Sequence, residues 1–112
     1  MIEETVRTFL QKVLDVPCFL EHEKDMPSEY IMIEKTGGNI DRMLRQSTLA
    51  IQSISTSMYK AAYLSNRVVT AMSLLIEDDN VLKVALNSDY NYTDTTTKKY
   101  RYQAVFDITH YE

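Results

Sequence analysis

The sequence predicts an α+β domain, with a mainly antiparallel sheet of four to five strands and two helices packed on one face. Residues 48–55 have the alternation of a strand and pass directly into a long helical pattern that reaches residue 76. Residues 2–14 have the spacing of an amphipathic helix, and residues 81–111 contain two alternating runs joined by a polar tip. The predicted order is helix, strand, strand, strand, helix, strand, strand, in a single domain spanning residues 1–112.

The long helix is predicted from a stripe of apolar residues that follows Ser57. These residues recur at steps of three and four, which places them on one face of a helix: Ala61, Leu64, Val68, Ala71 and Leu75. The hydroxyl residues at 55–57 can each cap the first turn, whose backbone N–H groups have no partner inside the helix. Residues 77–80 are expected to form the turn that ends it. We expect this strand and helix to hold the core together.

The N-terminal helix is predicted from a second apolar face: Ile2, Val6, Phe9, Leu10, Val13 and Leu14. Glu3 and Glu4 lie in its first turn, where the positive end of the helix dipole favours acids. Because Pro17 disfavours helical geometry at Val16, the helix should end within residues 15–17.

Strands are predicted at residues 17–22 and 30–35, ahead of the strand at 48–55. We predict that Gly37 and Gly38 form a structural turn that closes the second of these strands, since glycine adopts positive φ without a Cβ penalty. Residues 40–47 are expected to begin as a loop and then lead into the third strand.

The C-terminal runs, residues 81–90 and 100–111, predict an antiparallel hairpin with a long polar tip at 91–99. In the first run, alternation predicts Leu82, Val84, Leu86 and Tyr90 on one face and Lys83, Asn87 and Asp89 on the other. The sheet face away from the helices should carry mainly polar residues: Lys83, Asn87, Arg101, Gln103, Asp107 and Thr109, beside Val105 and Tyr111. Such a face can be solvated, or it can meet a neighbouring subunit in a moderately polar interface.

Charge and composition exclude some classes of protein. Sixteen acidic residues against twelve basic ones give a net charge of −4, and the basic residues cluster only at 98–101. Because nucleic-acid binders concentrate basic residues on one face, we expect no sequence-specific nucleic-acid binding. No apolar run approaches the roughly 20 residues that cross a bilayer, so we expect a soluble protein with no membrane partner. Eight tyrosines and no tryptophan fit either ordinary strand composition or surfaces that are wet before assembly and buried after it.

The residue chemistry names no reaction. Cys18, His22 and His110 are the natural candidates for a nucleophilic or metal site, but they lie in no recognisable motif, and we expect Cys18 to be a small buried apolar residue. The two glycines lack the Lys-Ser/Thr ending of a phosphate-binding loop, and the acids at 77–79 lack the ligand spacing of a calcium loop. We therefore predict a protein that is not an enzyme, with no cofactor and no metal.

Residues 29–38, Glu-Tyr-Ile-Met-Ile-Glu-Lys-Thr-Gly-Gly, resemble the strand and glycine turn of tail-terminator or tail-completion proteins of long, non-contractile-tailed bacteriophages. The family similarly begins with a short helix and follows the glycine turn with a strand of small and apolar residues. It continues with a helix that has alanines near its start, here Ala61 and Ala62, and ends in two strands. The resemblance therefore covers essentially the whole chain. Lys35 stands where arginine is frequent in the family.

The resemblance implies a structural virion protein whose copies form a ring, a hexamer, at the head-proximal end of the tail tube. The ring would stop tube growth and offer a docking surface to the head. Its partners would be further copies of itself, the tail tube protein and a head-completion or connector protein. It would reside at the head–tail junction of the virion, and in the host cytoplasm during assembly.

Two polar loops are the predicted partner contacts, with these residues: Asp41, Arg42, Arg45, Tyr92, Asp94, Lys98 and Lys99. Two other functions remain open from the sequence. One is a head-completion or connector protein, and the other is a small regulatory, ligand-binding α+β module.

Overall fold

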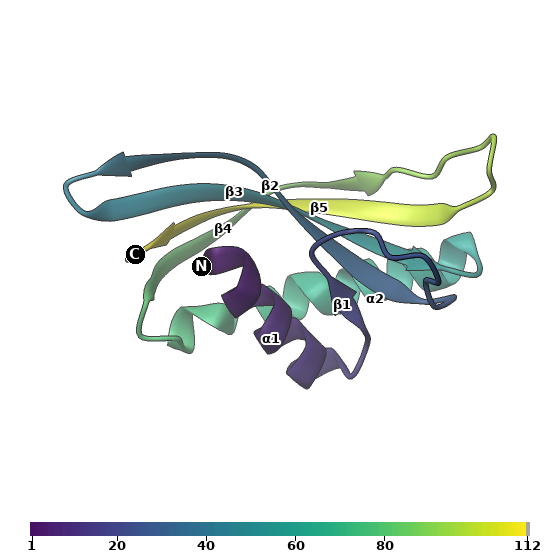
Figure 1. The fold of residues 1–112 in the computed structure, drawn as a ribbon, viewed down its shortest axis with the longest axis horizontal. Helices are drawn as coiled ribbons and strands as arrows, with labels where there is room; N and C mark the ends of the chain where they lie inside the picture. The colour runs from purple at the N-terminus through teal and green to yellow at the C-terminus, as the bar shows by residue number, and fades with distance from the viewer. Residues whose placement is uncertain (112) are drawn as a thin grey trace.

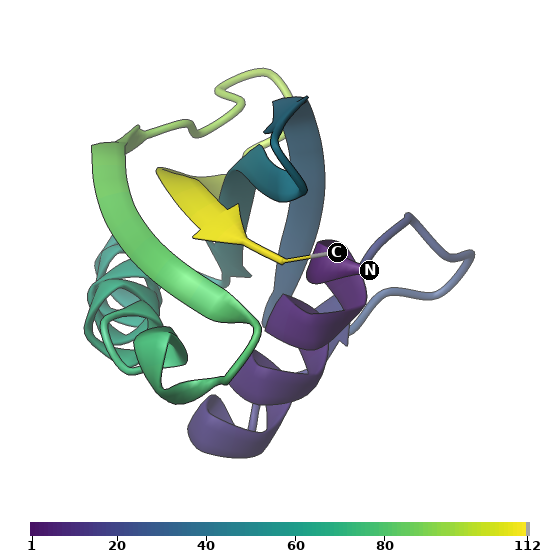
Figure 2. The ribbon, with the colours of Figure 1, turned by 90° about the vertical axis from the view of Figure 1, so that its left-hand side faces the viewer.

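Within residues 1–111, which the computed structural model describes, five strands form one twisted sheet, and α1 and α2 lie on the same face of it (Figures 1 and 2). The elements are α1 (Ile2–Leu14), β1 (Cys18–Phe19), β2 (Tyr30–Asp41), β3 (Leu44–Ser55), α2 (Met58–Met72), the short 3-10 helix η1 (Leu75–Glu77), β4 (Val81–Asn91) and β5 (Tyr100–His110). The strand order is β1-β2-β3-β5-β4; β1 pairs with β2 in parallel, and the other pairs are antiparallel. The predicted fold class and element order are confirmed.

The core lies between the helices and the inner face of the sheet. All five residues of the predicted α2 stripe are buried, although Leu75 lies in η1 because α2 ends at Met72. They pack with Leu49 and Ile51 of β3 and with apolar residues of β5. Burying one valine, leucine or isoleucine side chain contributes roughly 1.5–3 kcal/mol, so the larger residues of this layer supply much of the stability.

Helix ends are fixed by local hydrogen bonds. Ser57 is the N-cap of α2, and its hydroxyl accepts a hydrogen bond from the Lys60 N–H at 3.1 Å. Asp15 ends α1 in the left-handed conformation, with a φ of 55°. The Arg67 guanidinium of α2 donates to the Leu14 carbonyl at 2.9 Å and so ties the end of α1 to α2.

The first predicted strand is shorter than its sequence suggests. Only Cys18 and Phe19 pair with β2, not the whole of residues 17–22. Phe19 packs on the outer face with Met26, against Tyr30 and other apolar residues of β2 and β3. The chain therefore leaves the sheet after Phe19, and residues 20–29 form the connection that returns to β2.

The predicted turn at Gly37 and Gly38 is wrong. Both glycines lie inside β2 with negative φ, beside a register shift between Lys35 and Gly37. A Cβ on Gly38 would lie 3.0 Å from the Gln46 carbonyl oxygen, so this glycine permits close approach of the β3 backbone.

The turn lies instead at Arg42 and Met43, whose φ angles are 51° and 73°. The predicted loop in the first half of residues 40–47 is thus also wrong, because Ile40 and Asp41 continue β2, whereas the predicted entry into the third strand is confirmed, since β3 begins at Leu44. Left-handed backbone costs an ordinary L-residue roughly 1–2 kcal/mol, and neither Arg nor Met signals such a turn in a sequence.

The predicted faces of β4 also need a correction. Register shifts between Val81 and Lys83 and between Leu86 and Ser88 break the simple alternation. Tyr90 consequently lies opposite Gln103 on the outer face, and Asp89 faces α2, where Ser65 donates a hydrogen bond to its carboxylate at 3.1 Å. Each bulge adds one residue and moves the following side chains to the other face.

The molecule is elongated, with extents of 44 × 26 × 25 Å. The tip of the β2–β3 hairpin projects beyond the helices at one end of the long axis, and the β4–β5 tip lies at the other end (Figure 1). Among residues 1–111, no helix combines the length and apolar character needed to span a bilayer.

Candidate interaction surface

The outer face of the sheet, which α1 and α2 leave uncovered, carries hydrogen-bonded rows of polar side chains. In the first row, the Gln52 amide of β3 donates to the Gln103 amide oxygen of β5 at 2.9 Å. The Gln103 amide in turn donates to the Tyr90 hydroxyl of β4. Three strands are therefore bridged by side chains as well as by backbone.

A second row runs across the same three strands, centred on Asp107. One carboxylate oxygen accepts from the Thr48 hydroxyl at 2.8 Å, and the other accepts from the Asn87 amide at 3.1 Å. Because these bonds already restrict the side chains, a partner would meet a preordered polar surface and lose less rotamer freedom on binding. The mainly polar face predicted from the sequence is present, with Tyr90 added to it.

A hollow of about 460 Å³ opens on the outer side, between residues 20–22 and the base of the β4–β5 tip. Tyr92 and Arg101 line it together with Gln52. The Arg101 guanidinium lies 4.7 Å from the centroid of the Tyr92 ring, and its Nε donates to the Tyr92 carbonyl at 2.7 Å. Tyr92, a predicted contact residue, thus holds Arg101 in place at the base of the tip.

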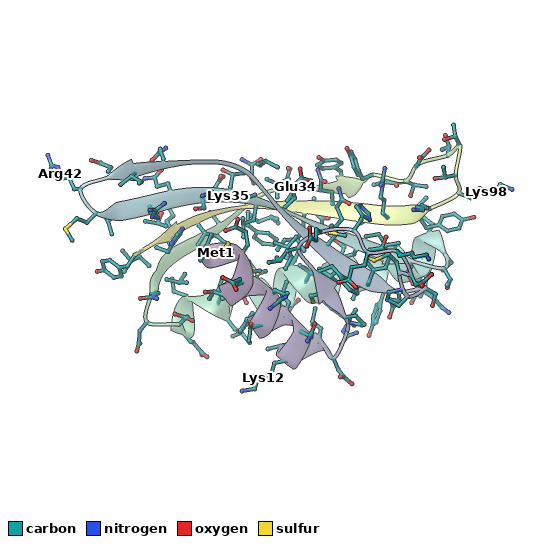
Figure 3. The ribbon with its side chains drawn as sticks, viewed as in Figure 1. Met1, Lys12, Glu34, Lys35, Arg42 and Lys98 are labelled. Atoms are coloured by element: carbon teal, nitrogen blue, oxygen red, sulfur yellow. The ribbon has the colours of Figure 1, made fainter. Side chains whose placement is uncertain are left out.

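Within the β4–β5 tip, residues 92–99, Asp94 organises the loop. Its carboxylate accepts from the Thr96 N–H at 3.0 Å and from the Thr96 hydroxyl at 2.6 Å. Hydrogen bonding lowers the pKa of Asp94 to about 2, and the bond from the Thr96 side chain is the largest cause. Lys98 points away from the body at the end of the tip (Figure 3), while Lys99 pairs with Asp94 through a short backbone bridge.

The other predicted contacts lie on what we call the arm, residues 37–47 of the β2–β3 hairpin. Arg42 points outward at its end (Figure 3), with Asp41 and Arg45 behind it on the two strands. The arm and the β4–β5 tip lie at opposite ends of the 44 Å axis. The structure therefore does not bring the predicted contact residues into one site.

Sequence reasoning missed an apolar surface on the helical side. Tyr59 and Tyr63 of α2 are 77% and 57% exposed, and their rings stack with centroids 6.4 Å apart. Beside them, a groove of about 450 Å³ runs between α1 and α2. Its lining combines apolar side chains with three polar ones: Val13, Leu14, Tyr63, Ala71 and Leu74, beside Asn66, Arg67 and Thr70. The available signal was a tyrosine pair four residues apart on the side of α2 opposite its core stripe.

The candidate nucleophile is not activated. Cys18 is buried, and its thiol donates to the Val16 carbonyl at 3.3 Å. Burial raises the pKa of the thiol to about 12, an effect that Arg7 only partly opposes. Cys18 therefore stays protonated near neutral pH, as expected of a structural residue.

The two histidines lie in different surroundings. His22 lines the outer hollow, whereas His110 is buried on the inner face beside Ser47. His110 Nδ1 donates to the Tyr111 carbonyl at 2.7 Å, so in the neutral ring Nε2 accepts from the Ser47 hydroxyl at 2.8 Å. Because both side chains are almost fully buried, this pair satisfies polar groups inside the sheet and has no face open to a substrate.

No cluster of three or more His, Cys, Asp or Glu side chains placed to hold a metal occurs in the described part of the chain. Comparison with protein-family models gave no match, and comparison with curated proteins also gave none.

Proposed function

We propose that this chain is a structural virion protein that forms a ring at the head-proximal end of a phage tail tube. The observation that carries the proposal is the resemblance of residues 29–38 to tail-terminator proteins, together with the family's order of elements along the chain. The glycines of that segment form part of a strand rather than a turn, so the resemblance rests on the strand and on the element order.

The surfaces of the molecule support a role in assembly. The outer sheet face is polar, ordered and free of helices, and the two tips extend in opposite directions (Figures 1 and 3). A ring subunit has to contact its neighbours and also the components above and below the ring. The mechanism of the proposed ring is geometric. One ring face is complementary to the last ring of the tube, and the other face does not bind further tube subunits. No catalytic step is part of the proposal.

Electron microscopy and mass photometry of the purified protein test the proposal directly. We expect closed rings, or monomers that assemble as concentration rises, and binding of the protein to the ends of purified tail tubes. A protein that stays monomeric at every concentration and also fails to bind tube ends would contradict the proposed function. Binding to portal complexes instead of tube ends would identify a head-completion or connector protein.

The hollow beside Arg101 supports a second candidate function, that of a small ligand-binding module. Glu21, His22 and Gln52 add polar groups to it, and a cavity of about 460 Å³ is of ordinary size for a small-molecule site. Thermal-shift measurements with small polar molecules would test this candidate. A ligand that raises Tm, together with the absence of the chain from purified virions, would favour it over the ring.

A further inference from the structure

One edge of the arm carries backbone groups that no neighbouring strand uses. Within residues 1–111, β1 covers only the start of β2, and from Ile33 to Asp41 no strand pairs with β2 on the side away from β3. Every residue from Glu34 to Met43 is exposed, and the arm projects beyond the helices (Figure 1). Because unpaired N–H and C=O groups along a strand form a template for another strand, an extended segment can be added here.

The register shows which residues direct their backbone groups to this edge. Ile31 faces the core, and its N–H donates to the Pro17 carbonyl on the β1 side at 2.9 Å. Side-chain direction and hydrogen-bonding direction alternate together along a strand, so the other inward-facing residues of β2 use the same side. Gly38 is one of them, since it pairs with the buried Ser47 of the inner face, and Ile40 follows two residues later. Gly38 and Ile40 thus each offer an N–H and a C=O to the open side.

The same two residues are complementary in size across an antiparallel pair. Ile40 is 61% exposed, whereas Gly38 has no side chain. The aliphatic stem of Lys35 lies over Gly38, with its Cε 3.0 Å from the position that a Cβ would take. Ile40 of one copy can therefore pack beside Gly38 of another, against the stem of its Lys35. This register sets Asn39 opposite Asn39, and each of these amides has both a donor and an acceptor.

Charge favours the antiparallel direction. The Glu34–Lys35 end of the segment carries one acid and one base, and so does the Asp41–Arg42 end. In an antiparallel pair each end lies alongside the opposite end of the other copy, which brings Asp41 near a lysine and Arg42 near a glutamate. A parallel pair in register would instead set Asp41 beside Asp41 and Arg42 beside Arg42.

We propose that residues 37–41 of β2 pair with the same residues of a second copy, as an antiparallel ladder with a two-fold axis at Asn39. The contact is isologous, so it saturates as a dimer. It goes beyond the proposed ring, whose neighbouring subunits meet through different patches. So short a ladder buries little surface, and we expect a weak dimer that forms as protein concentration rises.

Ile40→Pro tests the ladder by removing the N–H that Ile40 directs to the open edge. Proline is tolerated on edge strands, so the variant should stay folded by circular dichroism. We expect the dissociation constant of the dimer, measured by sedimentation velocity, to rise at least ~10-fold, because the N–H is lost from both copies. Ile40→Thr is the matched control. It keeps the N–H and the β-branched shape, so its dissociation constant should lie closer to that of the unmodified protein.

Asn39→Cys tests the register of the ladder. Its thiol would face the thiol of the second copy across the axis, so mild oxidation should link the two chains by a disulfide. Asp41→Cys is equally exposed but would lie opposite Gly37 of the second copy, and it should not cross-link. The native Cys18 is buried and should not compete for oxidation.

A folded Ile40→Pro variant that dimerises as tightly as the unmodified protein would overturn the pairing of the arms. Equal cross-linking of Asn39→Cys and Asp41→Cys would also overturn it, as would an unmodified protein that stays monomeric at every concentration. If Ile40→Pro fails to fold, the two cysteine variants decide the question. The proposed function is judged separately. Dimers that form neither rings nor caps on tube ends would contradict the tail role and leave the pairing of the arms standing.

Discussion

At the scale of single residues, the two glycines of β2 have different reasons to be glycine. A Cβ added to Gly37 meets nothing within 4 Å, whereas a Cβ on Gly38 would press on the β3 backbone. We expect Gly37→Ala to leave stability unchanged or to raise it by about 0.4–1 kcal/mol, because alanine restricts the unfolded chain. Gly38→Ala should destabilise the fold, and urea unfolding of the pair would measure the difference. Equal effects at both positions would contradict the strand geometry described for them.

Asp94 gives a prediction that depends on pH. Its folded-state pKa of about 2 lies below the ordinary value of 3.8, so its hydrogen bonds stabilise the tip above pH 4 and are lost as pH falls through about 2. Carboxyl NMR should show Asp94 titrating near 2, and the Thr96 amide signal should move with it. In Thr96→Ala the pKa should rise toward 3.8. A titration near 3.8 in the unmodified protein would show that these hydrogen bonds do not persist in solution.

At the scale of elements, the cap of α2 is open to a matched test. Ser57→Ala removes the acceptor for the Lys60 N–H and should lower the free energy of unfolding by about 1 kcal/mol. Thr56→Ala, one residue earlier and exposed, should change it by less than about 0.5 kcal/mol. Denaturant unfolding monitored by circular dichroism would compare them. A larger loss at Thr56 would mean that α2 begins elsewhere.

The elements that the sequence predicted well are those with an unbroken periodicity. In α2 all five residues of the predicted stripe are buried, and in α1 Ile2, Val6, Leu10 and Leu14 are buried, although Val13 of the predicted face is exposed. The faces of β4 failed because a bulge shifts the register without altering the composition of the strand. The turn at Arg42 and Met43 was missed because its residues are not turn formers, while the glycines nearby supplied a false signal.

The candidate contact residues show the same limit in three dimensions. Sequence placed Arg42 and Lys98 in polar tips, and both lie at tips (Figure 3). Their separation along the long axis depends on the strand order β2-β3-β5-β4, which no local pattern encodes. The α1–α2 groove was missed for a related reason, since residues of α1 and α2 that are far apart in the sequence build it together.

At the scale of the whole molecule, the single cysteine reports on global opening. Cys18 lies between α1 and β2 and is shielded by both. With its pKa raised to about 12, the native thiol should react with a maleimide at pH 7 far more slowly than the unfolded chain does. We expect labelling to rise with denaturant along the same curve as circular dichroism. Fast labelling without denaturant would indicate that the end of α1 opens independently.

The two long edges of the sheet are unequal, and this sets how strands from other molecules can be added. Beyond Met32, β2 pairs with no strand on the side away from β3, so the backbone groups of Ile33–Asp41 that do not bond to β3 lie along an open edge. The register shifts of β4 twist the opposite edge, and Lys83 adds a charge there, features that discourage strand addition. A fibril needs two competent edges on every chain. Pairing through β2 alone would stop at two molecules, so we expect the bulges of β4 to limit amyloid-like growth at high protein concentration.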